Sequence, residues 1–100
     1  MSIYTIKRMS EFDVWLSGIK DGLTRIRLVR RIDRLQLGFL GDVAPVGEGV
    51  HELREFFGPG WRIYFTERKG MLIVLLGGCS KSTQKEDIAR AIALSKTLSD

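Results

Sequence analysis

Hydrophobic positions recur at helical spacing in two neighbouring stretches near the beginning of the chain. Residues 11–19 form the first stretch, and Ser10 before it is a good N-terminal cap, so we predict a helix there. From residue 23 onward the apolar positions step mainly by three, which predicts a second amphipathic helix that ends near Gly38. Only residues 20–22 separate the two helices, and so short a turn predicts an antiparallel helical hairpin.

Runs rich in β-branched and aromatic residues predict strands in much of the remaining chain. We expect four of them, at residues 2–7, 50–56, 61–67 and 71–76. The stretch 41–49 contains glycine and proline and is predicted to be a loop. A short turn at 68–70 predicts a hairpin between the last two strands, and the last strand is apolar at every position, so we expect it to be central and covered on both faces.

A third amphipathic stretch at residues 84–98 predicts a C-terminal helix, which Ser82 or Thr83 can cap. The predicted order is therefore β-α-α-β-β-β-α. This order indicates an α+β fold in which a helical hairpin packs on a mostly antiparallel, four-stranded sheet. The 100 residues fit a single domain, residues 1–100.

Composition narrows the class of protein further. Hydrophobic residues make up 44% of the chain, which is ordinary for a globular domain, and no apolar run approaches the roughly 18 residues of a membrane span. The first residues lack the apolar core of a signal peptide, and Cys79 is the lone cysteine, so we expect a cytoplasmic protein without membrane association. Without a Cys/His cluster, we expect neither a metal site nor a cofactor.

The charge balance favours an acidic partner. Sixteen Lys and Arg residues stand against twelve Asp and Glu residues, and ten of the sixteen are arginine, which suits bidentate phosphate contacts. The run 25–34 holds five arginines and one aspartate on the polar side of the second predicted helix. Such a run is commonly a solvated helix face, but Arg27, Arg30 and Arg31 are also candidates for contact with ribosomal RNA or an acidic partner.

Strand parity groups a second set of polar residues. Successive side chains of a strand point to opposite faces, so Arg62 and Tyr64 share one face, and Trp61, Ile63 and Phe65 share the other. In the preceding strand Glu52 and Arg54 share a face in the same way. With Leu53 facing the core, these four polar residues lie together on the open face of the sheet, where they form a candidate phosphodiester site. The same parity also fits a solvated sheet face with a Glu–Arg cross-strand pair.

The segment GGCSKSTQK, residues 77–85, follows the last strand and brings further polar groups to the same end of the sheet. Its two glycines allow close approach of the backbone, and Lys81 and Lys85, with Ser82 and Gln84, could join the two sheet arginines around one phosphate. The alternative is a helix-capping loop with two solvated lysines.

Three segments together resemble a known family. They are GVHELREFFGPGWRIYF (residues 49–65), LIVLLGGCSKSTQKEDIARA (residues 72–91) and the preceding LGDVAPVGEGVHELR (residues 40–54). In this combination they are similar to the RelE/HigB-like toxins of bacterial type II toxin–antitoxin modules. The similarity is greatest to the phage-derived "addiction module killer protein" branch of the RelE/ParE superfamily, and it covers nearly the whole chain.

The resemblance implies a small α+β toxin that enters the ribosome and cuts mRNA within translated codons as a metal-independent endoribonuclease. The family's basic sheet residues map onto Arg54 and Arg62, and those after the last strand map onto Lys81 and Lys85. Proton transfer from the 2′-hydroxyl needs a base, for which Glu52, a lysine or His51 are candidates. Tyr64 could orient the leaving group or stack on a base.

The chain departs from the family in one respect, because several relatives place a Tyr or His near the C-terminus and this chain has neither after Tyr64. The family also implies a cognate antitoxin, usually from the adjacent gene and with a helix-turn-helix domain, through which operator DNA is bound. The ParE toxins share the fold, so a non-cleaving inhibitor of DNA gyrase remains an alternative function.

Overall fold

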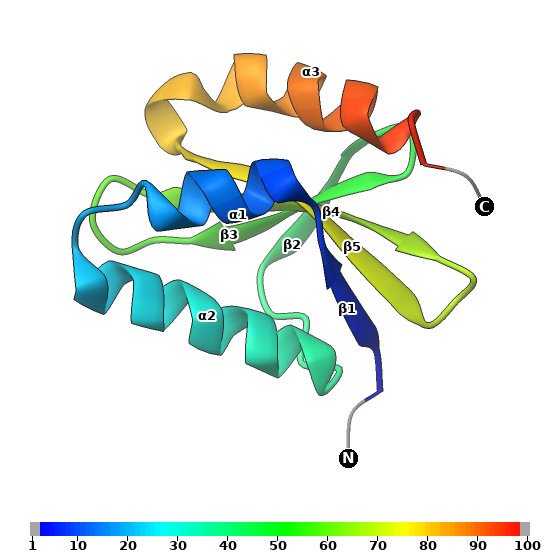
Figure 1. Ribbon diagram of the computed structural model, residues 1–100, viewed down its shortest axis with the longest axis horizontal. Coiled ribbons are helices and arrows are strands. Elements are labelled where there is room, and N and C mark those ends of the chain that lie inside the picture. The colour runs from blue at the N-terminus through cyan, green and yellow to red at the C-terminus, as the bar shows by residue number, and fades with distance from the viewer. Residues whose placement is uncertain (1–2, 99–100) are drawn as a thin grey trace.

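The computed structural model describes residues 3–98, within which three helices, one short 3-10 turn and a five-stranded sheet follow one another (Figure 1). The fold is α+β, as predicted. The elements in chain order are β1 (Thr5–Arg8), α1 (Ser10–Ser17), α2 (Gly22–Gln36), β2 (Val43–Gly47), β3 (Val50–Glu55), β4 (Trp61–Arg68), β5 (Leu72–Ser80), η1 (Lys81–Thr83) and α3 (Gln84–Ser95).

The strands are arranged in the order β1-β5-β4-β3-β2. Strand β1 runs parallel to β5 and the other neighbours are antiparallel, so the sheet is mostly antiparallel, as predicted. Strand β5 has a neighbour on each side and is therefore an interior strand, while β4 is the middle strand. The first predicted strand corresponds to β1, although its residue Ser2 lies outside the described residues.

The predicted count of four strands is wrong, because β2 lies in the stretch that we expected to be a loop. Its Pro45 has no N–H to donate, which argues against a central strand but not against the edge of a sheet, where β2 lies. The connection to β3 places Glu48 and Gly49 at positive φ, which suits a tight hairpin turn.

The helices cover both faces of the sheet, with α3 on one side and α1 and α2 on the other (Figure 1). The face under α1 and α2, which we call the hairpin face, is apolar throughout its core. It contains Leu53, Ile63 and Phe65, as strand parity predicted. The helices contribute Phe12, Leu16, Leu28, Ile32 and Leu35 to it.

The opposite face, which we call the α3 face, has a smaller apolar cluster around Val74, Leu76 and Ala91. Tyr64 and Cys79 belong to the same cluster, so polar atoms enter the core on this side. No helix among residues 3–98 is long and apolar enough to cross a membrane.

One helix cap differs from the sequence prediction, and a second cap was not predicted. Ser10 is the first residue of α1 rather than its cap, which is Met9, and the Ser10 hydroxyl bonds to Glu11 instead. Helix α2 is capped by Asp21, whose carboxylate accepts hydrogen bonds from the Leu23 amide and the Thr24 hydroxyl. The bond from Thr24 is the main cause that lowers the pKa of Asp21.

Candidate active site

Two arginines lie directly opposite each other where β3 ends and β4 begins, on the strand positions that belong to the α3 face. Arg54 of β3 and Arg62 of β4 are register partners, so their Cβ atoms leave the sheet side by side, as the parity of the two strands predicted. Like charges in this arrangement repel each other and lower stability. Each arginine has its own carboxylate neighbour, which offsets this cost.

Glu52 is the carboxylate beside Arg62. Its Oε1 lies 3.7 Å from Arg62 Nε, while its Oε2 accepts hydrogen bonds from the Tyr64 hydroxyl at 2.9 Å and from the Gln84 amide at 2.6 Å. Only 2% of Glu52 and 5% of Arg62 is exposed. A buried carboxylate with this many donors is fixed in place, and it fixes the arginine beside it.

The prediction that this face of the sheet is open is therefore wrong. Helix α3 and the turn before it pack over the strands, and Gln84, the first residue of α3, reaches the carboxylate of Glu52. Tyr64 is only 1% exposed, so a stacking contact between its ring and an RNA base is not available in this conformation. The parity assignment was correct, but the covering helix could not be read from parity.

Arg54 lies nearer to solvent than Arg62. Its guanidinium donates two hydrogen bonds to Asp42 Oδ1, from Nη2 at 2.7 Å and from Nε at 3.1 Å. These bonds, and the charge of Asp42, raise the pKa of Arg54 above its ordinary value. Sequence reasoning missed Asp42 because it lies in the stretch 41–49, predicted to be a loop.

Arg62 makes fewer contacts than its burial demands. Its Nη1 donates to the Trp61 carbonyl at 3.1 Å, but its Nε is buried without a hydrogen-bond partner. Its guanidinium also lies 5.7 Å from the centroid of the Phe56 ring. A buried cation with spare donor capacity is the kind of group that functional sites retain.

Lys81 approaches Arg62 where β5 ends. The Lys81 amide donates to the Gly60 carbonyl at 2.8 Å, which ties η1 to the turn before β4. A Cβ built on Gly60 would lie 3.5 Å from Lys81 Cβ and 3.8 Å from Arg62 Nη1, so both side chains pass this glycine. Gly60 has a φ of 82°, which other residues rarely adopt.

The remaining predicted groups of this segment lie at the surface. Ser82 and Lys85 are exposed, and the Ser82 hydroxyl is 2.8 Å from that of Ser80. Gln84 is drawn inward by Glu52, as described above.

Other titratable groups near the arginine pair lie on the other face of the sheet or are buried. His51 lies on the hairpin face, where its ring stacks on Phe65 with 5.5 Å between centroids, so it does not reach Arg62. The Tyr64 hydroxyl lies 3.5 Å from Cys79 Sγ, and burial raises the pKa of both groups. Both therefore remain protonated near neutral pH and are poor bases.

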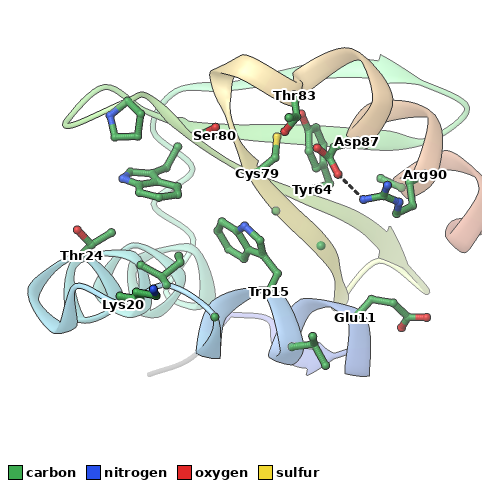
Figure 2. A pocket seen from close by; sticks show the side chains of 18 of the residues that line it. Glu11, Trp15, Lys20, Thr24, Tyr64, Cys79, Ser80, Thr83, Asp87 and Arg90 are labelled. Carbon is green, nitrogen blue, oxygen red and sulfur yellow. Dashed lines mark hydrogen bonds and ion pairs between the residues drawn. The ribbon is translucent and has the colours of Figure 1, made fainter.

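A groove of about 1100 Å³ lies beside this network, between α1 and α3 (Figure 2). Figure 2 shows Tyr64, Cys79 and Thr83 on one side of it and Trp15 of α1 on the other. The ring of Trp15 lies where a Cβ on Gly78 would have to be, so the glycine allows α1 to approach β5. The groove is mainly apolar, and its ion pair joins Asp87 to Arg90 at 2.7 Å.

The sequence predicted that Arg31 faces solvent on α2. It is instead buried, with only 7% of the residue exposed. Its guanidinium donates to the carbonyls of Phe39 and Leu40 and so closes the connection between α2 and β2. Burial lowers the pKa of Arg31. Arg27 and Arg30 are exposed, as expected of that helix face.

Comparison with known proteins gives a relative but no activity. An uncharacterized protein of Haemophilus influenzae is 42% identical over 93 residues, which cover 93% of this chain and 94% of the relative. The chain belongs to the same family as that protein. No protein-family model matches the chain.

Proposed function

We propose that this chain is the toxin of a type II toxin–antitoxin module, a RelE/HigB-like endoribonuclease that cuts mRNA on the ribosome. The observation that carries the proposal is the arginine pair, Arg54 opposite Arg62, with Lys81 beside it. This arrangement brings basic residues from β3, β4 and η1 near one another, although repulsion between like charges costs stability. A phosphodiester that gains negative charge during cleavage accounts for the arrangement.

The proposed reaction is attack of a ribose 2′-oxygen on the adjacent phosphorus. The new bond from the 2′-oxygen forms while the bond to the 5′-oxygen breaks, which leaves a 2′,3′-cyclic phosphate and a 5′-hydroxyl. The 2′-hydroxyl loses a proton to a base and the leaving oxygen gains one. Arg62 and Arg54 supply positive charge beside the non-bridging oxygens, since guanidinium groups remain charged.

Lys81 and Lys85 are the candidates for the proton transfers. Glu52 is a positioning residue in this proposal, because its oxygens are already bonded to Tyr64 and Gln84 and it is buried beneath Arg62. This role replaces that of general base, which we had considered from the sequence.

The proposed partners are the ribosome, its mRNA and a cognate antitoxin in the cytoplasm. The antitoxin is expected from the adjacent gene, as a small protein with a helix-turn-helix domain. Operator DNA is then bound only through the antitoxin. The resemblance of the sequence to RelE/HigB-like toxins supports these partners.

One observation favours a second candidate, a ParE-like inhibitor of DNA gyrase that cuts no RNA. Neither His51 nor Tyr64 is placed to act as acid or base at Arg62, because the first lies on the other face and the second is buried. A site without these groups suits a toxin that acts by binding alone.

The test is expression of the chain without antitoxin, followed by measurement of protein synthesis and mapping of mRNA 5′ ends. We expect rapid arrest of translation with mRNA cut in register with the reading frame. Arrest with intact mRNA and broken DNA would support the gyrase inhibitor instead. Absence of any arrest contradicts both.

Variants locate the site in the same assay. Arg62→Ala would leave Glu52 buried without its cation, so loss of folding must be separated from loss of activity. We therefore use Arg62→Lys, which keeps the charge, and Arg54→Ala at the more exposed position. Each variant should reduce cleavage at least tenfold, and its thermal unfolding midpoint shows whether it still folds. The control Lys69→Ala, in the β4–β5 turn, should leave cleavage unchanged.

A further inference from the structure

A second cationic concavity lies next to the proposed active site, on the side of α2. We call it the arginine pocket. It has a volume of about 440 Å³ and is lined by five arginines and two carboxylates, together with Gly41 and Phe56. The charged residues are Arg27, Arg30, Arg31, Arg34, Arg54, Asp42 and Glu55. The excess of positive charge makes an anion the natural occupant.

The arginines of the pocket divide into fixed and available groups. The Arg31 guanidinium donates to two backbone carbonyls and that of Arg54 to Asp42, so these two side chains are held in place. Arg27, Arg30 and Arg34 are exposed, and among residues 3–98 the Arg30 side chain makes no hydrogen bond or ion pair. Three guanidinium groups on successive turns of α2 are therefore free to bind oxygens.

Aromatic rings accompany these arginines. The Arg27 guanidinium lies 3.8 Å from the Phe57 ring centroid, and that of Arg34 lies 5.7 Å from the Phe39 centroid. These contacts hold the long side chains near fixed positions and reduce the entropy that binding would cost.

Phe56 links the pocket to the active site. It lines the arginine pocket, and the guanidinium of Arg62 lies 5.7 Å from its ring centroid. Phe56 is 69% exposed, whereas the next residue, Phe57, is half-buried against the core. An exposed ring between two cationic sites is typical of surfaces on which unpaired bases stack.

We propose that the arginine pocket and Phe56 form a subsite for single-stranded RNA that flanks the nucleotide at Arg62. One base stacks on Phe56, and the phosphates that follow it bind Arg27, Arg30 and Arg34. This inference rests on the proposed function, because it takes Arg62 as the point where the strand is cut. The ring favours a nucleic acid over an acidic peptide, and only an unpaired base can stack on it.

Binding of a fluorescent 12-nucleotide RNA to the whole chain, followed by anisotropy at low salt, tests the subsite. Phe56→Ala should weaken binding about tenfold, as expected for the loss of one base stack. The double variant Arg30→Glu/Arg34→Glu should weaken it further and should reduce the dependence of affinity on salt, since each lost phosphate contact removes about 0.7 from the slope.

Matched controls remove the same kinds of group elsewhere. Met71→Ala truncates an exposed apolar side chain at the β4–β5 turn, and Lys7→Glu/Lys69→Glu reverses two exposed charges away from the pocket. Both should bind RNA within about twofold of the wild type. Equal losses in the controls and the pocket variants would overturn the subsite, because the effect would then be net charge alone.

Three further outcomes also decide between these possibilities. If an acidic peptide competes as well as RNA, and Phe56→Ala changes neither, the occupant is a protein and the proposal is wrong. If the pocket variants lose RNA binding but the wild type never cuts mRNA on ribosomes, the subsite stands and the proposed function fails. If the pocket variants bind RNA as the wild type does and cut mRNA at the same positions and rate, the function stands and the subsite fails.

Discussion

The two faces of the sheet are both covered by helix, yet they are built from different groups. The hairpin face holds a cluster of ten buried hydrophobic residues between the sheet and the first two helices. The α3 face buries a glutamate, an arginine and a tyrosine in contact with one another beneath α3. A buried apolar side chain needs no specific partner, whereas each buried polar group here requires a hydrogen-bond or ion-pair partner.

This difference separates the face that stabilises the fold from the face that can hold a functional site. The hairpin face supplies stability through area removed from water, so the α3 face is free to hold a charged cluster that contributes little net stability. We therefore expect substitutions on the first face to affect unfolding, and substitutions on the second to affect activity and unfolding together.

The largest expected effect is on the hairpin face. Leu28→Ala removes a fully buried side chain from α2 and leaves a cavity, so the free energy of unfolding should fall by about 3–4 kcal/mol. Urea denaturation measures it. The control is Leu23→Ala in the same helix, where the side chain is exposed and the change should stay within about 0.5 kcal/mol. Similar losses for the two would mean that α2 does not pack as described.

The next effect is on the α3 face. Glu52→Ala leaves Arg62 buried without its counter-charge and removes the acceptor of Tyr64 and Gln84, so we expect a loss of about 2–3 kcal/mol. Glu52→Gln keeps the shape and one acceptor and should cost less. If the two variants unfold alike, within error, the charge of Glu52 has no part in holding Arg62.

A steric substitution sharpens the boundary between the faces. Gly78→Ala places a methyl group where the Trp15 ring lies, so it should displace that ring and cost about 1–3 kcal/mol. The neighbouring Gly77→Ala meets nothing within 4 Å and should be nearly neutral. Tryptophan fluorescence, together with urea denaturation, reports both. A neutral Gly78→Ala would show that α1 does not approach β5 so closely.

The smallest effect is a dependence on pH. Burial raises the pKa of Cys79 in the folded state above its ordinary value of 9.0, so the unfolded chain releases this proton first as pH rises. The contribution of Cys79 to the free energy of unfolding should therefore be fully present below pH 9. Above pH 9 the free energy of unfolding should fall by about 1 kcal/mol for each pH unit. Urea midpoints across this range measure the fall, and Cys79→Ala should make it shallower. An unchanged slope in that variant would contradict the raised pKa.

Much of the fold was predictable because periodicity is a local property. The helical spacing before residue 38 and the alternation in residues 61–67 predicted the hairpin, the core residues Ile63 and Phe65, and the shared face of Arg54 and Arg62. The edge strand β2 was not predictable in this way, since its glycine and proline residues are typical of loops.

The sequence by itself determined which residues share a face, because backbone geometry fixes that direction within a few residues. Only the tertiary structure decided which face is covered. Gln84 reaches Glu52 across 32 positions of the chain, and that contact changes an open face into a buried, polar one. Likewise Arg31 belongs to an exposed-looking helix run, but a returning loop buries its guanidinium. Burial depends on what packs from elsewhere in the chain, and no local pattern contains that information.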